Sequence, residues 1–120
     1  MLRCVIVDDS PVFLEAAASV LERHGVRVVG VAGTAQEAVE RVQELRPDVT
    51  LLDVNLGAES GFEVARRLSQ EAGVEPEQMI LISTEDADEY ADLLVDSPVA
   101  GFLSKAALSG AGIRELLGLA

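Results

Sequence analysis

The sequence has very few of the residues that build disulfides, soft metal sites or membrane spans. It contains one cysteine, one histidine and no tryptophan among its 120 residues. A single cysteine cannot form a disulfide within the chain, which favours a reducing compartment. No apolar run approaches the roughly 18–20 residues that cross a bilayer, and the amino terminus lacks a signal-peptide pattern. We therefore expect a cytoplasmic protein with no membrane segment.

Basic residues are scarce as well. Nine Lys and Arg residues stand against 21 Asp and Glu residues, which gives a formal net charge of −12. An acidic chain repels the phosphate backbone, so direct nucleic-acid binding is not expected, and most of this acidity is interpreted as a solvated surface. With 49% hydrophobic and 25% charged residues, the chain is predicted to form a single globular domain over residues 1–120.

Short apolar runs alternate with segments of helical spacing. The runs are four to six residues long, rich in Val, Ile and Leu, and barely alternate in polarity, as strands buried on both faces do. Helices are predicted to begin at Ser10-Pro11 and at two capping boxes, Thr34 with Glu37 and Ser60 with Glu63. The predicted strands are Leu2–Val7, Val26–Val31, Val49–Leu52, Met79–Ile82 and Val99–Leu103, and the last two predicted helices are Glu85–Val95 and Ser109–Leu117.

Five strand–helix repeats predict an α/β fold. The expected architecture is a doubly wound, five-stranded parallel sheet of order 2-1-3-4-5, a flavodoxin-like (βα)5 arrangement. The other common order, 3-2-1-4-5, would place a nucleotide site after the first strand. That site needs a Gly-rich turn, whereas the first strand continues into Asp8-Asp9-Ser10-Pro11. Dinucleotide binding is therefore poorly supported.

Polar residues end four of the predicted strands. In the order 2-1-3-4-5 the first and third strands are neighbours, so Asp8, Asp9 and Asp53 should converge at the carboxyl edge of the sheet. Three carboxylates in one crevice are solvated, share protons or bind a cation, and with oxygen ligands alone the cation should be Mg²⁺, with Mn²⁺ as second choice. Ser83 and Lys105, the only lysine, end two further strands. This combination suits phosphoryl transfer, although single residues of this kind also serve as turn formers.

The ordered set of motifs resembles the receiver domain of bacterial two-component response regulators, over essentially the whole chain. Val5-Ile6-Val7-Asp8-Asp9-Ser10 resembles the first strand and acidic pair of that family, and Asp48–Asp53 resembles the strand that ends in its phosphorylated aspartate. Gly61 lies where the family keeps a glycine eight residues later. Ile82-Ser83 and Gly101–Lys105 are similar to the switch hydroxyl and to the aromatic residue and lysine of the last strand.

The resemblance implies a role for each of these positions. Asp53 would accept a phosphoryl group from a sensor histidine kinase or phosphotransfer protein, and Ser83 and Lys105 would contact the phosphoryl oxygens. Ser83 and Phe102 would switch the surface of the fourth helix, last strand and last helix, which would control a fused or separate output partner. The chain would be a switch with at most self-phosphorylation and self-dephosphorylation chemistry. Mg²⁺ would be held by Asp8, partly through water, Asp9, Asp53 and the backbone carbonyl of Asn55.

Two departures from the family pattern keep alternatives open. Ala106 follows the lysine and Gly57 follows the phosphoacceptor by four residues, where the family commonly has proline. A phosphorylation-independent interaction module therefore remains the alternative, and Phe102 is equally well interpreted as a core aromatic. A haloacid-dehalogenase-type phosphatase fits poorly because neither Asp8 nor Asp53 is followed two residues later by an acid. We expect a monomer without phosphate, because the acidic fourth helix (Glu85, Asp86, Asp88, Glu89, Asp92) would repel its own copy.

Overall fold

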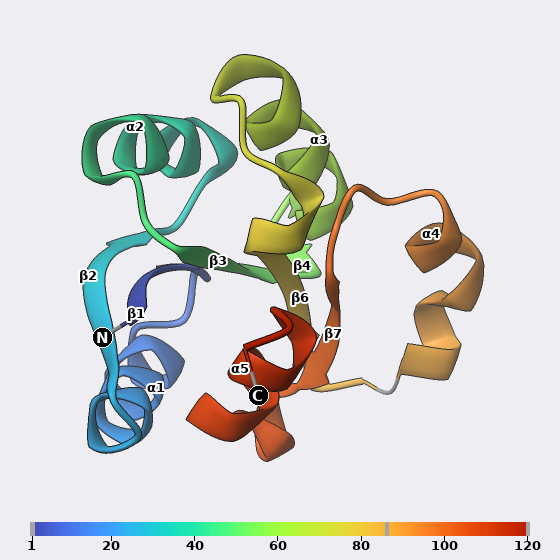
Figure 1. Cartoon of the computed structure of the whole chain (residues 1–120). Helices are drawn as coiled ribbons and strands as arrows, with labels where there is room; N and C mark the ends of the chain where they lie inside the picture. Colours follow the sequence, from blue (N-terminus) through green and yellow to red (C-terminus); the bar gives the residue numbers. More distant parts are fainter. Residues whose placement is uncertain (1, 86, 120) are drawn as a thin grey trace.

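The computed structural model describes residues 2–85 and 87–119. Its main sheet has five parallel strands in the order β2-β1-β3-β6-β7, and Figure 1 shows the helices on both sides of it. Numbered by their place among these five, the strands follow the predicted order 2-1-3-4-5, so the predicted fold class is confirmed. The strands are β1 (Leu2–Val7), β2 (Val26–Ala32), β3 (Val49–Asp53), β6 (Met79–Ser83) and β7 (Gly101–Ser104).

The helices begin where the sequence places capping side chains. The Ser10 hydroxyl accepts a hydrogen bond from the amide of Phe13, the Thr34 hydroxyl from that of Glu37, and the Ser60 hydroxyl from that of Phe62. Each bond satisfies an amide that the first helical turn leaves without a partner. The helices are α1 (Pro11–Arg23), α2 (Ala35–Leu45), α3 (Gly61–Glu71), α4 (Ala91–Val95) and α5 (Gly110–Leu116).

Alternate residues of the central strands enter two separate cores. On one face, Leu52 and Leu81 pack with residues of α2 and α3, such as Val42 and Leu68. On the other, Ile6, Leu51 and Ile80 pack with residues of α1 and α5, such as Leu21 and Ile113. This two-sided burial explains why the central strands are mostly apolar and why the acids of the sheet edge appear where the strands end.

The segment predicted as the fourth helix, Glu85–Val95, is where the structure differs most from the sequence prediction. Ala87–Tyr90 is a 3-10 turn (η2), and only Ala91–Val95 is α-helical. Among the described residues no side chain caps α4. Acids crowd this segment of the sequence with no basic residue between Glu85 and Val95, so local repulsion disfavours a longer helix. Asp86, which was included in the predicted helix, lies outside the described residues.

A small antiparallel hairpin that the sequence did not predict follows β3. It pairs β4 (Asn55–Leu56) with β5 (Glu59–Ser60). Gly57 turns the chain there with a φ of 61°, a left-handed conformation that glycine adopts without strain. The hairpin delivers the chain directly to the start of α3.

Two further features concern the cysteine and the lengths of the helices. Cys4 is fully buried in β1, and burial raises the pKa of its thiol to about 12, so it behaves as a small apolar side chain. Among the described residues no helix is long and apolar enough to cross a membrane.

The close packing at the start of α3 predicts that a side chain at position 61 destabilises the fold. A Cβ placed on Gly61 would lie 2.3 Å from the backbone carbonyl oxygen of Asp53. Gly61→Ala should therefore lower the free energy of unfolding by about 2 kcal/mol, measured by urea denaturation. Gly33→Ala is the matched control, because its Cβ would meet nothing closer than 3.6 Å. Equal stability of the two variants would contradict this packing.

Candidate functional site

Three carboxylates meet at the carboxyl edge of the sheet, as the sequence predicted. Asp8 and Asp9 follow β1, and Asp53 ends the neighbouring strand β3. One oxygen from each of them lies within 4.8 Å of the others. Asp8 is 0% and Asp53 5% exposed, whereas Asp9 is open to solvent. The cluster is therefore buried at its base and open on one side.

Lys105 is the cation of this cluster. Its Nζ lies 2.6 Å from Oδ2 of Asp8 and 3.4 Å from Oδ2 of Asp53. The same Nζ lies 4.3 Å from the centre of the Phe13 ring of α1, a favourable cation–π distance. The lysine predicted to face the acids does so, and its shorter contact is to Asp8 rather than to Asp53.

Backbone amides hold the second oxygen of each buried carboxylate. The amide of Ser10 donates to Oδ1 of Asp8 at 2.8 Å, and the amide of Asn55 donates to Oδ1 of Asp53 at 3.2 Å. The backbone is fixed in turn, since the amide of Asp8 donates to the carbonyl of Ala32 and that of Val54 to the carbonyl of Ile82. Both side chains are thus oriented before any ligand arrives.

The electrostatics of the cluster oppose the ionisation of Asp53. Burial raises the pKa of Asp53 above its ordinary value, and the nearby Asp8 carboxylate raises it further. Lys105 and the Asn55 amide lower the pKa of Asp53 again, but the net direction is upward. A second cation at this edge would favour the ionised carboxylate.

The donor set fits a hard divalent cation. It offers only carboxylate oxygens, with one acid exposed and two buried, which is the chemistry that Mg²⁺ prefers over Zn²⁺. Asp9 makes no hydrogen bond to the described residues, so its carboxylate is free to ligate. The two buried acids form the base of the site, and the exposed Asp9 supplies its open carboxylate.

Ser83 and Phe102 lie on the strands next to the cluster. Ser83, 1% exposed at the end of β6, accepts a hydrogen bond on its Oγ from the amide of Glu85 at 3.0 Å. Within the described part of the chain, its hydroxyl forms no hydrogen bond with Asp53 or Lys105. The Phe102 side chain is partly buried against the core shared with α2 and α3. The structure therefore brings Lys105 onto the acids and leaves Ser83 engaged with its own loop.

Two aromatic residues at the site were not singled out from the sequence. The Tyr90 ring lies between those of Phe62 and Phe102, with centroid distances of 5.9 and 6.1 Å. Its hydroxyl accepts a long hydrogen bond of 3.5 Å from the side chain of Asn55. Phe13 lies under Lys105. Tyr90 is the single tyrosine, but no spacing rule connects it to residues so distant in sequence.

Comparisons with known proteins agree on one family. The family model described as the response regulator receiver domain matches residues 4–115. Over 119 residues, the chain is 29% identical to the response regulator GacA of Pseudomonas viridiflava, covering 98% of this chain and 52% of that protein. The signal receiver domain of the putative response regulator NarL from Mycobacterium tuberculosis superposes with a TM-score of 0.80 at 29% identity, covering 98% of this chain and 94% of that one.

Several curated relatives are much longer than this chain. Over 84 residues, the chain is 42% identical to protein-glutamate methylesterase/protein-glutamine glutaminase 1 of Syntrophus aciditrophicus. The match covers 69% of this chain but only 23% of that enzyme, and the chain spans about half of GacA. The likeness therefore concerns a domain that these proteins share.

The raised pKa of Asp53 predicts a pH-dependent effect of Asp53→Asn. The pKa of Asp53 is higher in the folded chain than in the unfolded chain, where it is about 3.9. The free energy of unfolding therefore falls as the pH rises from that value through the folded-state pKa of Asp53. Without added metal, the variant should therefore be more stable than the parent by about 1 kcal/mol near neutral pH, with the difference vanishing at low pH. Urea denaturation across this pH range tests this, with the exposed Asp96→Asn as control; a destabilised Asp53→Asn near neutral pH would contradict it.

Removal of the lysine charge should have the opposite effect. Lys105→Met keeps the length of the side chain but leaves the fully buried Asp8 carboxylate without a cation, which should lower the free energy of unfolding by about 3 kcal/mol. In thermal denaturation, added Mg²⁺ should raise the melting temperature of Lys105→Met by more than it raises that of the exposed Arg66→Met control, whose acids keep the Lys105 charge. Equal stability of the two variants would show that Lys105 does not balance the acids.

Proposed function

Because the chain belongs to the response regulator receiver domain family, we propose that it is a phosphorylation-dependent signalling switch whose phosphoacceptor is Asp53. Receiver domains of this family are signalling switches, and residues 1–120 would act as one such domain. The observation that carries the proposal is the convergence of Asp8, Asp9 and Asp53 with Lys105 at one edge of the sheet.

Asp53 would act as the nucleophile. One of its carboxylate oxygens attacks the phosphorus of a phosphohistidine, the P–N bond breaks, and its electron pair returns to the imidazole of the donor. The amide of Asn55, which donates to Oδ1 at 3.2 Å, orients the carboxylate, and Lys105 next to Oδ2 neutralises a phosphoryl oxygen. The product is an acyl phosphate on Asp53.

A cation site for this reaction would be formed by Asp9, Asp53, the backbone carbonyl of Asn55 and, partly through water, Asp8. Bound Mg²⁺ would supply charge neutralisation for the carboxylates and the incoming phosphoryl group. Asp8 contributes mainly by holding Lys105, because its Oδ2 and Oδ1 are already engaged with Lys105 and the Ser10 amide. Asp9, exposed and without a hydrogen-bond partner among the described residues, is the ligand that can approach a cation first.

Ser83 would convert phosphorylation into a change of shape. Its hydroxyl now accepts from the Glu85 amide, and its own hydrogen can be donated to a phosphoryl oxygen on Asp53. Movement of Ser83 would pull the loop that leads into η2, which carries Tyr90. The Tyr90 ring contacts both Phe62 and Phe102. A movement of Tyr90 would therefore shift Phe102 and change the surface of α4, β7 and α5.

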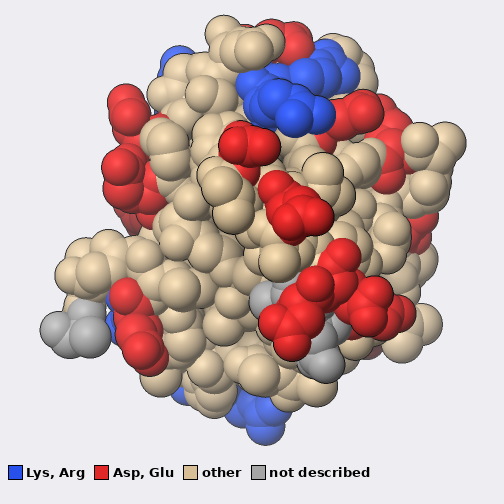
Figure 2. All heavy atoms as spheres, turned by 90° about the vertical axis from the view of Figure 1, so that its right-hand side faces the viewer, with Lys and Arg blue, Asp and Glu red and all other residues tan. Residues whose placement is uncertain are grey.

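The expected partners follow from this role. A sensor histidine kinase or phosphotransfer protein would deliver the phosphoryl group in the cytoplasm, and a fused or separate output partner would read the switched surface. Figure 2 looks onto the α4 side and shows groups of acidic side chains there; Asp88, Glu89 and Asp92 are exposed. Like charges on facing copies repel, so the unphosphorylated chain would be monomeric and would not bind nucleic acid directly.

Phosphorylation can be tested by mass. The chain is incubated with acetyl phosphate and Mg²⁺, and its intact mass is recorded for the parent, Asp53→Asn and the exposed control Asp96→Asn. The parent and Asp96→Asn should gain one phosphoryl group, and Asp53→Asn and any sample with EDTA should gain none. No gain in the parent would favour a phosphorylation-independent module, and turnover of a phosphomonoester would favour a phosphatase.

A further inference from the structure

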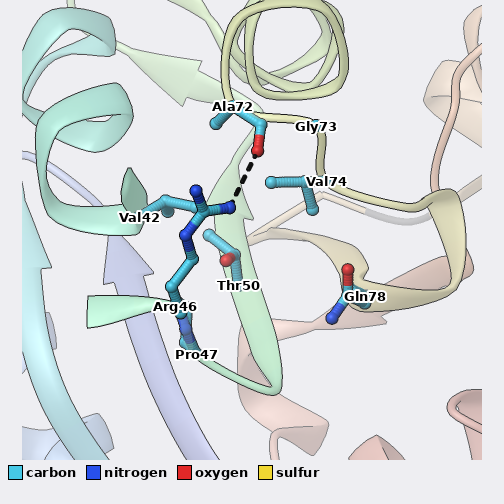
Figure 3. A pocket seen from close by; sticks show the side chains of 8 residues that line it. All are labelled: Val42, Arg46, Pro47, Thr50, Ala72, Gly73, Val74 and Gln78. Atoms are coloured by element: carbon cyan, nitrogen blue, oxygen red, sulfur yellow. Dashed lines mark hydrogen bonds between the residues drawn. The ribbon is translucent and has the colours of Figure 1, made fainter. Parts of the chain in front are cut away.

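A second candidate site lies at the opposite edge of the sheet from the acid cluster. It is a cavity of about 110 Å³ between the carboxyl ends of α2 and α3, the start of β3 and the short turn η1 (Pro76–Gln78). Figure 3 shows the side chains that line it. Its apolar walls come from Val42, Pro47, Ala72 and Val74.

Three polar side chains line the same cavity and retain unused hydrogen-bonding groups. The Arg46 guanidinium donates only one long bond of 3.4 Å, to the carbonyl of Ala72 (Figure 3), and forms no ion pair with the described residues. Thr50 is 1% exposed, and its hydroxyl makes no hydrogen bond within the described ranges. The Gln78 carbonyl oxygen accepts from the Glu75 amide, which leaves its NH2 group without a partner in that part of the chain.

Thr50 is the most informative of the three. It lies on the central strand β3, paired with Met79 and followed by Leu51 and Leu52, in a position where valine would have nearly the same shape. No described side-chain oxygen is both fully buried and without a partner, so the Thr50 hydroxyl keeps contact with the cavity, where water or a ligand can bond to it. Its position at the cavity wall gives such a ligand room to bind.

The positive charge at the cavity indicates the class of ligand. Two nearby acids have other partners, since Asp48 accepts from the amide of Arg3 and Glu71 pairs with Arg67 at 2.6 Å, and no described acid forms an ion pair with Arg46. Arg46 is therefore left as a cation facing a small cavity with hydroxyl and amide donors beside it. A guanidinium binds a carboxylate through two parallel hydrogen bonds. The single positive charge of Arg46 also matches the single negative charge of a carboxylate better than the higher negative charge of a phosphate.

We propose that this cavity binds a short aliphatic carboxylate. The carboxylate group would accept from Arg46 and Thr50, and the alkyl chain would pack against Val42 and Val74. A dry cavity of about 150 Å³ in another protein holds benzene, so a cavity of 110 Å³ suits an acid of about four carbons. Because Arg46 is exposed, the affinity should be modest, with a Kd on the order of 1 mM.

Butyrate is the probe for this site. It is titrated into the ¹⁵N-labelled chain without Mg²⁺ or phosphodonor, at constant ionic strength, while amide chemical shifts are recorded. Saturable shifts should centre on Arg46, Thr50, Gly73 and Gln78. Butyramide, the neutral analogue of the same shape, should bind at least about tenfold more weakly, because it lacks the charge that Arg46 pairs with.

Variants separate a specific site from general charge attraction. Arg46→Gln and Thr50→Val should each weaken butyrate binding by about fivefold or more, and Arg66→Gln, which removes an exposed arginine from α3, should leave it unchanged. Absence of saturation, equal binding of butyramide, or an equal loss in Arg66→Gln would overturn the proposal. The experiment involves no phosphoryl transfer, so its result is independent of the role of Asp53.

Discussion

The contact between Lys105 and the two buried carboxylates of Asp8 and Asp53 is the interaction on which the site depends. The three groups come from the ends of β1, β3 and β7, which are brought together only by the sheet order. Two carboxylates so close in a buried position repel each other, and one ammonium group cannot fully balance them. The unligated site is thus held in an arrangement that a further cation or a change of charge on Asp53 would alter.

The rest of the fold serves to fix this arrangement. Two apolar cores pack against the two faces of the sheet, which restricts the movement of the polar residues at the strand ends. The backbone bonds from Asp8 to Ala32 and from Val54 to Ile82 continue the strand pairing as far as the acids. The close approach of Gly61 to the carbonyl of Asp53 ties the start of α3 to the same point. Several of the contacts that stabilise the fold therefore converge on Asp53.

The sequence predicts the sheet and the acid cluster because both depend on local signals. Apolar runs mark buried strands, and a polar residue directly after such a run must lie at the sheet edge, which places Asp8, Asp53 and Lys105. The Tyr90 contacts with Phe62 and Phe102, the short α4 and the β4–β5 hairpin could not be predicted in this way. They depend on side-chain packing between distant segments, on repulsion among neighbouring acids and on the turn at Gly57. The cavity beside Arg46 and Thr50 also forms only when α2 and α3 pack on β3.

A ¹³C chemical-shift titration of the side-chain carboxyls tests the central claim most directly, with Asp53 assigned by its loss in Asp53→Asn. Burial and the charge of Asp8 should place the pKa of Asp53 above its ordinary value of about 3.9 without metal, and Mg²⁺ should lower it. A pKa of Asp53 at or below the ordinary value that Mg²⁺ leaves unchanged would contradict this account of the site.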